Sequence, residues 1–138
     1  MNKIRLGIIG MGNMGSGHLR SIMKGESPRI TVTAFADIVR EKLDKASEIC
    51  PSAKAFDNAE EMLDSGLIDA ALIAVPHYDH PKLAIECFKR GIHVMTEKPA
   101  GVYTRQVREM NEAVKAANVK FGIMFNQRTN PIYFRFRP

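Results

Sequence analysis

The fold is decided by the stretch Ile4-Arg5-Leu6-Gly7-Ile8-Ile9-Gly10-Met11-Gly12-Asn13-Met14-Gly15. Residues 4–9 are a short apolar run, which is typical of a buried parallel strand. The glycines that follow have the spacing G-x-G-x-x-G, and apolar residues then recur at near-helical spacing from Met14 to about Lys24, before Gly25. The sequence therefore predicts a strand, a glycine-rich turn and a helix in direct succession.

This order gives each of the three glycines a task in binding a dinucleotide. Gly10 permits the tight turn, Gly12 lets the backbone approach a pyrophosphate where a Cβ would clash, and Gly15 lets the helix pack closely on the strand. Free N–H groups and the positive end of the helix dipole attract the diphosphate. The predicted diphosphate site comprises Gly10, Met11, Gly12, Asn13, Met14 and Gly15. A glycine-rich turn without a ligand is the alternative.

Strand-like and helix-like segments alternate along the rest of the chain. Further strands are expected at 30–36, 54–56, 70–75, 92–96 and 119–125, and helices at about 39–49, 57–63, 81–90 and 104–117, with Asp57 and Thr104 as helix caps. Such alternation forces parallel strands with right-handed crossovers and helices on both faces. We therefore predict an α/β fold with a doubly wound parallel sheet of the Rossmann type, in three α/β/α layers.

Asp37 directly follows the second expected strand, 22 residues after Gly15. A carboxylate at this position can accept hydrogen bonds from both hydroxyls of an adenine ribose, which favours NAD as the cofactor. Its charge repels the 2′-phosphate of NADP, although Arg40, one helical turn away, can offset part of the repulsion, so NADP stays possible. Asp37 can also cap the helix that begins near Val39.

Two further clusters fall at the carboxyl ends of the fourth and fifth expected strands. They are Val75-Pro76-His77 and Glu97-Lys98-Pro99. Ligands of open α/β sheets collect in the crevice where the strand order reverses, so Lys98 is expected within reach of a bound nicotinamide. An ammonium there can donate a hydrogen bond to a substrate hydroxyl and stabilise the alkoxide that forms as hydride leaves carbon. A solvated pair of Glu97 and Lys98 is the alternative.

The composition is that of one globular domain, with 138 residues, 45% of them apolar and 25% charged. Much of the net charge of +5 is terminal, because the last 13 residues carry Arg128, Arg135 and Arg137 and no acid. Aromatic and basic residues interleave at 134–137, but four residues are a weak signal for nucleic acid. We therefore expect no nucleic-acid partner.

The cysteines and the apolar runs bear on the cellular compartment. Cys50 and Cys87 are 37 residues apart, a spacing that fits neither a metal site nor a redox pair, so buried free thiols and no metal site are expected. The longest purely apolar run, residues 70–75, is too short to cross a bilayer, and the N-terminus has no signal-peptide core. We expect a cytoplasmic protein without a membrane partner.

The motifs together resemble one known family of oxidoreductases. They read Gly10-x-Gly12-x-x-Gly15-x-x-His18, then Val75-Pro76-His77-x-x-His80-x-x-x-Ala84-x-x-Cys87-x-x-x-Gly91-x-His93-Val94, then Glu97-Lys98-Pro99, in this order over nearly the whole chain. This combination is similar to the glucose-fructose oxidoreductase, inositol dehydrogenase and rhizopine-catabolism (Gfo/Idh/MocA) family. The resemblance implies an NAD(P)-dependent oxidoreductase whose substrate is a sugar, a polyol or a similar hydroxyl-bearing molecule.

The resemblance also implies roles for individual residues. Lys98 matches the family lysine beside nicotinamide and substrate, Glu97 would orient the surroundings of the cofactor, and Pro99 would shape the turn. His77 stands where relatives often carry Asn, so its contact with the cofactor is less secure than that of the glycines. The other histidines, expected to be structural, are His18, His80 and His93.

The resemblance divides the chain into a dinucleotide-binding domain, residues 1–125, and an exit segment, residues 126–138. Relatives continue for roughly another domain, which binds substrate and supplies an aspartate and a histidine for proton transfer. We therefore expect that the substrate domain is absent, that residues 134–138 reflect a truncation or a shifted reading frame, and that this chain alone is not fully active. Relatives associate through that domain, so a homo-oligomer is possible. A non-catalytic dinucleotide sensor or interaction module is the alternative function, against which the presence of Lys98 argues.

Overall fold

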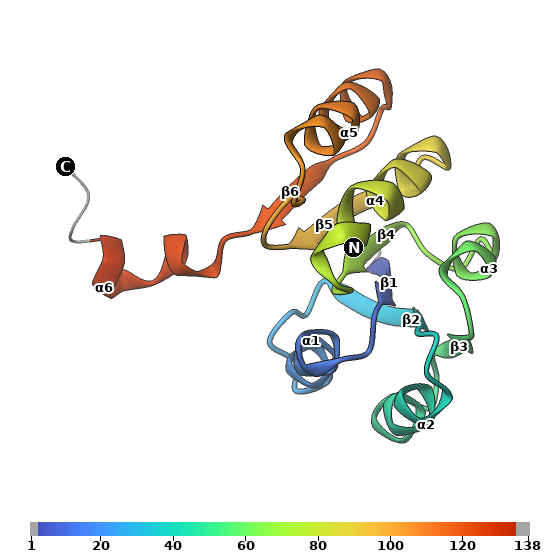
Figure 1. The fold of residues 1–138 in the computed structure, drawn as a ribbon. Helices are drawn as coiled ribbons and strands as arrows, with labels where there is room; N and C mark the ends of the chain where they lie inside the picture. The colour runs from blue at the N-terminus through green and yellow to red at the C-terminus, as the bar shows by residue number, and fades with distance from the viewer. Residues whose placement is uncertain (1–2, 135–138) are drawn as a thin grey trace.

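The computed structural model describes residues 3–134, and six parallel strands form a single sheet in it (Figure 1). The strands are β1 (Ile4–Ile9), β2 (Ile30–Ala36), β3 (Lys54–Phe56), β4 (Ala70–Ile73), β5 (His93–Glu97) and β6 (Phe121–Met124). Their order is β3-β2-β1-β4-β5-β6, so the order reverses at β1, which pairs with β2 on one side and β4 on the other. This is the doubly wound arrangement that the sequence predicts.

Helices cover both faces of the sheet. They are α1 (Asn13–Met23), α2 (Arg40–Ile49), α3 (Ala59–Asp64), α4 (His80–Lys89), α5 (Thr104–Ala116) and α6 (Pro131–Phe134), with 3₁₀ turns η1 (His77–Asp79) and η2 (Asn126–Thr129). Figure 1 shows α1 and α2 on one face and α3, α4 and α5 on the other. The predicted three-layer α/β/α fold is confirmed.

The central strand β1 is apolar throughout its second half because both of its faces are covered. Successive side chains of a strand point to opposite faces, so Ile8 packs with Leu19 of α1, while Ile9 packs with Met62 of α3. Cys87 is fully buried on the α4 side, and this burial raises the pKa of its thiol to about 12. Cys50 is buried on the other side, and both cysteines are free, as expected.

Both predicted helix caps are wrong. Asn58, not Asp57, caps α3: its side-chain oxygen accepts a hydrogen bond from the N–H of Glu61 at 2.9 Å, and its amide donates to the Glu61 carboxylate at 2.8 Å. This reciprocal pair resembles a capping box, which satisfies two donors at once. Thr104 is the first residue of α5, and the preceding Tyr103 occupies the cap position without a side-chain hydrogen bond.

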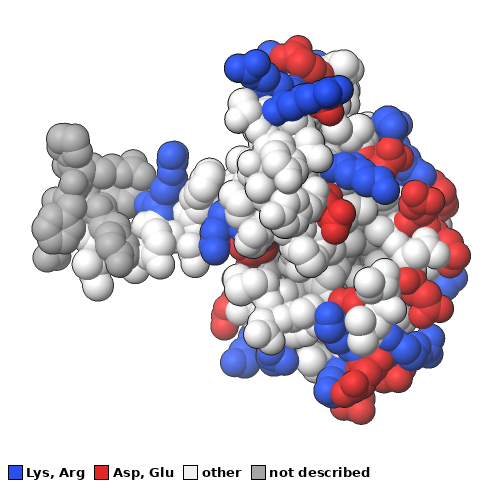
Figure 2. Space-filling model, viewed as in Figure 1, with Lys and Arg blue, Asp and Glu red and all other residues white. Residues whose placement is uncertain are grey.

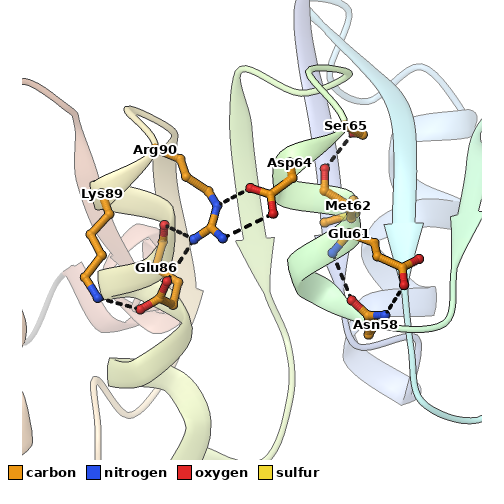
Figure 3. Close-up of polar contacts among 8 residues, drawn as sticks. All are labelled: Asn58, Glu61, Met62, Asp64, Ser65, Glu86, Lys89 and Arg90. Atoms are coloured by element: carbon orange, nitrogen blue, oxygen red, sulfur yellow. Dashed lines mark hydrogen bonds and ion pairs between the residues drawn. The ribbon is translucent and has the colours of Figure 1, made fainter.

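Arg90 ties the end of α4 to the end of α3 (Figure 3). Its Nε lies 2.6 Å from Oδ1 of Asp64, and its Nη1 lies 2.8 Å from Oε2 of Glu86, which Lys89 also contacts. These hydrogen bonds lower the pKa values of both carboxyl groups, Asp64 through Arg90 and Glu86 through Lys89 and Arg90. The contact fixes α3 against α4, two of the elements that surround the site described below.

The segment after β6 extends away from the sheet through η2 and α6 (Figure 1). The described residues end at Phe134, the last residue of α6. The expected truncation or frameshift at 134–138 and the basic residues Arg135 and Arg137 therefore lie outside the described residues, apart from Phe134. Figure 2 shows acidic and basic side chains interspersed over the visible face, with uncharged atoms between them. No helix within residues 3–134 is both long and apolar enough to cross a membrane.

Candidate dinucleotide site

A cavity of about 600 Å³ opens at the carboxyl ends of β1, β2 and β4. Ile9 and Gly10 line it from the end of β1, and Asp37 lines it from the end of β2. Ala74 and Val75 line it just after β4. The cavity therefore lies at the reversal of strand order, where ligands of open α/β sheets bind.

Glycine is needed at Gly10 and Gly15 for different reasons. Gly10 has φ +92°, which side chains rarely adopt, and a Cβ there would lie 2.7 Å from the carbonyl oxygen of Ala74. A Cβ at Gly15 would overlap the carbonyl oxygen of Gly10, because the first turn of α1 packs directly on the turn. Gly10 therefore permits the tight turn and Gly15 the close packing of helix on turn, as the sequence predicts.

The third glycine faces open space. A Cβ at Gly12 would meet no atom within 4 Å, and Gly12 lines the cavity together with Asn13 and Met14. Gly12 is also the N-cap residue of α1, and because glycine has no side chain, no side-chain hydrogen bond caps the start of this helix. Since the first N–H groups of a helix attract anions, this surface has the shape and the donors that a diphosphate requires.

Asp37 joins the glycine turn to the end of β2. Its Oδ2 accepts a hydrogen bond from the N–H of Met11 at 2.7 Å, and its Oδ1 accepts one from the N–H of Val39 at 2.9 Å. The side chain is only 6% exposed but lines the cavity. Each carboxylate oxygen has two lone-pair directions, so the group can also accept hydrogen bonds from ribose hydroxyls. Asp37 thus holds the backbone ahead of α2 as well as facing the cavity.

The cation beside Asp37 is Lys42, which the sequence reasoning missed. Arg40 lies outside the cavity lining, and its guanidinium pairs with Asp44 and Asp57. Lys42 lines the cavity, and its Nζ lies 3.6 Å from Oδ2 of Asp37. Lys42 is the third residue of α2, a position whose side chain can reach back over the start of a helix. That position is the signal from which the contact could have been expected.

The residues after β4 divide between the cavity and the neighbouring structure. Val75 and Pro76 line the cavity, whereas His77 is exposed in η1 and lies outside the lining. His80 is fully buried, with its ring nitrogens each 2.8 Å from a main-chain carbonyl oxygen, that of Val75 and that of Pro99. His80 therefore joins the segment after β4 to the segment after β5, in agreement with a structural role.

Glu97, the last residue of β5, and Lys98, the residue that follows, lie outside the cavity lining. Glu97 is buried, and its Oε1 lies 2.6 Å from Nε2 of His18, so the pair connects β5 to α1. Lys98 is exposed, and it makes no hydrogen bond or ion pair with any of the residues that the structure describes. Its ammonium is therefore available to a ligand at the carboxyl edge of β5.

The structure thus brings together seven of the thirteen predicted cofactor residues around one cavity: Gly10, Gly12, Asn13, Met14, Asp37, Val75 and Pro76. Two others support the turn, Met11 through its hydrogen bond to Asp37 and Gly15 through its packing on Gly10. The remaining four, which lie outside the lining, are Arg40, His77, Glu97 and Lys98. Over the described part of the chain, no three His, Cys, Asp or Glu side chains are grouped to hold a metal ion.

An open parallel sheet, a turn with room for a diphosphate and an acid at the end of β2 define a dinucleotide-binding Rossmann domain. Comparison with known proteins identifies the family. Residues 4–125 match the model of the Gfo/Idh/MocA oxidoreductase family, NAD-binding Rossmann fold. The chain belongs to this family, as the motifs of its sequence indicate.

Individual relatives are consistent with this assignment. The chain is 30% identical over 132 residues to the rhizopine catabolism protein MocA of Rhizobium meliloti, and 29% identical over 125 residues to the myo-inositol 2-dehydrogenase of Thermotoga maritima. These alignments cover 95% and 91% of the chain but 40% and 37% of the relatives.

Solved structures give the same result. The chain superposes on the scyllo-inositol dehydrogenase of Lactobacillus casei, determined with bound NAD(H) and scyllo-inositol, with a TM-score of 0.91 and 26% identity. The superposition covers 97% of this chain and 39% of that one. The chain therefore spans about two fifths of the length of these proteins.

Proposed function

We propose that this chain binds NAD(H) in the cavity beside β1 and serves an oxidoreductase that acts on a polyol, a sugar or a similar hydroxyl-bearing substrate. The observation that carries the proposal is the open space in front of Gly12, with Asp37 lining the same cavity. A site that had lost its ligand would be under no constraint to keep this space free of side chains. The relative determined with NAD(H) and scyllo-inositol supports the same cofactor and substrate class.

The residues present would hold the two ends of the dinucleotide differently. The backbone from Gly10 to Met14 would hold the diphosphate, and Asp37 would accept hydrogen bonds from the adenine ribose. Val75 and Pro76 provide an apolar wall toward the nicotinamide end. Bound NAD supplies a ring that accepts hydride from the carbon bearing the substrate hydroxyl.

Lys98 is the proposed catalytic residue of this chain. It follows β5, whose carboxyl end lies beside that of β4, and its ammonium has no partner among the described residues. An unpaired ammonium can donate a hydrogen bond to the substrate hydroxyl and stabilise the negative charge that develops on its oxygen. Glu97 and His77 are proposed to shape the surroundings of the nicotinamide rather than to exchange protons.

The proposal extends to the organisation of the chain and its compartment. We take residues 1–125 as the dinucleotide-binding domain and residues 126–138 as the segment that leads out of it. The extension of η2 and α6 away from the sheet supports this boundary (Figure 1). The two buried free thiols support a cytoplasmic location, where cysteines stay reduced.

Isothermal titration calorimetry of NADH into this chain tests the proposal. Saturable binding at one site per chain is expected, with an apparent heat capacity change that is negative because apolar surface is buried. A matched titration of AMP should give weaker binding, since AMP lacks the second phosphate and the nicotinamide. If neither NADH nor NADPH shows saturable binding, the cofactor assignment is overturned.

A further inference from the structure

Lys42 is the cation that stands beside the ribose-binding acid. Its Nζ lies 3.6 Å from Oδ2 of Asp37, and within residues 3–134 no other cation lies within 4 Å of that carboxylate. The Lys42 side chain is 43% exposed and lines the cavity, so its ammonium stands at the wall of the site, in contact with solvent. A mobile, partly hydrated ammonium can turn from one anion to another without leaving a buried charge.

Asp37 does not depend on Lys42 to satisfy its hydrogen bonds. Its two oxygens already accept hydrogen bonds from the main-chain N–H groups of Met11 and Val39. The ammonium is therefore free to contact a ligand while Asp37 keeps its position. An anionic group brought next to this carboxylate would be repelled by Asp37 and attracted by Lys42.

We infer that Lys42 determines cofactor choice, giving the site a measurable affinity for NADPH in addition to NADH; this inference rests on the proposed function. In the proposed complex, Asp37 accepts a hydrogen bond from the 2′-hydroxyl of the adenine ribose. A 2′-phosphate there lies within the reach of the Lys42 ammonium, which compensates part of the repulsion by Asp37. The hydroxyl of NADH needs no such compensation.

The other cations near the cavity are less suited to this role. Arg40 is already paired with two exposed acids, since its Nε lies 3.1 Å from Asp44 and its Nη1 lies 3.5 Å from Asp57, and it does not line the cavity. Lys82, the other lysine in the lining, comes from α4 and forms no ion pair with Asp37. The geometry therefore favours Lys42 over the arginine that sequence spacing suggests.

Calorimetric titrations of NADH and NADPH into the wild-type chain and three variants test the inference. Lys42→Met removes the charge and keeps the length of the stem. Lys45→Met is the matched control, because Lys45 lies on the same helix, is exposed and pairs with Glu41 outside the cavity. Arg40→Met tests the rival arginine. Thermal unfolding followed by circular dichroism verifies that each variant is folded.

In Lys42→Met the affinity for NADPH is expected to fall about fivefold to tenfold, with the affinity for NADH changed less than about twofold. Lys45→Met and Arg40→Met should leave the ratio of the two affinities unchanged. Three outcomes would overturn this inference while leaving the proposed function in place. They are an unchanged ratio of the two affinities in Lys42→Met, a fall of NADPH affinity in Arg40→Met instead, and a wild-type chain that binds NADH but not NADPH. A wild-type chain that binds neither nucleotide would overturn the proposed function, and this inference with it.

Discussion

The main-chain N–H of Met11 donates a hydrogen bond to Oδ2 of Asp37 across 2.7 Å. Met11 lies between Gly10 and Gly12, so the turn that faces the diphosphate and the acid that faces the ribose are connected directly. The neighbouring Val39 N–H donates to the other oxygen of the same carboxylate. One side chain therefore sets the relative position of the two parts of the site before any ligand arrives, which lowers the entropy lost on binding.

Replacing Asp37 by Ala should weaken NADH binding and narrow the preference for NADH over NADPH. Charge-assisted hydrogen bonds contribute about 1.5–3 kcal/mol each, so a fall of at least tenfold in NADH affinity is expected. NADPH affinity should fall less, because the 2′-phosphate is no longer repelled. Calorimetric titration of both nucleotides measures the ratio.

The control for this substitution is Asp44→Ala, which removes an exposed carboxylate of α2 that pairs with Arg40. It should leave both affinities unchanged. A ratio of NADH to NADPH affinity that is the same in Asp37→Ala and in the wild type would contradict the assigned role of Asp37.

Substitutions of two glycines in one turn should separate folding from binding. Gly15→Ala places a Cβ against the carbonyl oxygen of Gly10 and should cost at least about 2 kcal/mol of stability. Gly12→Ala meets no protein atom, so its melting temperature should stay within about 3 °C of the wild type, while NADH binding falls more than about tenfold. Calorimetry and thermal unfolding distinguish the two effects.

Gly17→Ala provides the reference for these two variants. Gly17 lies within α1, where a Cβ would also meet no atom within 4 Å, and alanine favours a helix over glycine by about 1 kcal/mol. Its stability should rise slightly and its affinity for NADH should not change. If the Gly12→Ala variant bound NADH with the affinity of the wild type, the diphosphate would have to lie elsewhere.

Replacing His80 by Ala should destabilise the fold. The ring is fully buried, with its nitrogens each 2.8 Å from a carbonyl oxygen, that of Val75 and that of Pro99, and loss of these polar contacts and of the packing should cost about 2–4 kcal/mol. Urea unfolding measures the change. The exposed His77, whose ring lies 5.7 Å from that of His80, is the matched control, and His77→Ala should cost less than about 0.5 kcal/mol. Equal stabilities of the two variants would refute the bridging role.

Removing the arginine that joins α4 to α3 should have an effect that depends on pH. The lowered pKa values of Asp64 and Glu86 mean that their ionised forms stabilise the fold above the ordinary carboxyl range, and that this contribution is lost as the pH falls through the lowered values. The stability difference between the wild type and Arg90→Met should therefore be largest above about pH 5 and shrink toward pH 2.

Urea unfolding at pH 7, 5 and 3 measures this difference. Arg105→Met, which removes an exposed arginine paired with Glu109 on α5, is the control and should show little change at any pH. A difference between wild type and Arg90→Met that grows as the pH falls would contradict the assignment of the ion pairs in Figure 3.

The sequence predicts the sheet well because its signals are local and repeated. Each of the six strands lies in a segment that the sequence predicts to be a strand, since the buried central strands are short apolar runs and the alternation with helices indicates the edge strands. The ends of elements were less accurate: β4 ends at Ile73 instead of Val75, and α3 is capped by Asn58 instead of Asp57. Asp57 and Asn58 are both good capping residues, so the choice depends on the backbone that precedes the helix.

The contacts of the site were predicted less completely than its position. The glycines and Asp37 are recognisable because backbone geometry requires these residue types at fixed spacing. The pairing of Lys42 with Asp37 depends on where α2 begins, and a helix start displaced by one residue would change which side chain reaches back. The contact of His18 with Glu97 joins residues 79 positions apart, for which one sequence offers no local signal.

Strand β1 takes one of its two neighbours from β4, which begins only at Ala70. Nascent chains that end before this point hold the glycine turn and Asp37, yet one edge of β1 still lacks its hydrogen-bonding partner. A break at the exposed Gly66 would leave each fragment with part of the nucleotide crevice, so NADH affinity would appear only when the two fragments reassemble. The crossover that places β4 beside β1 thus makes nucleotide binding depend on segments from both sides of Gly66.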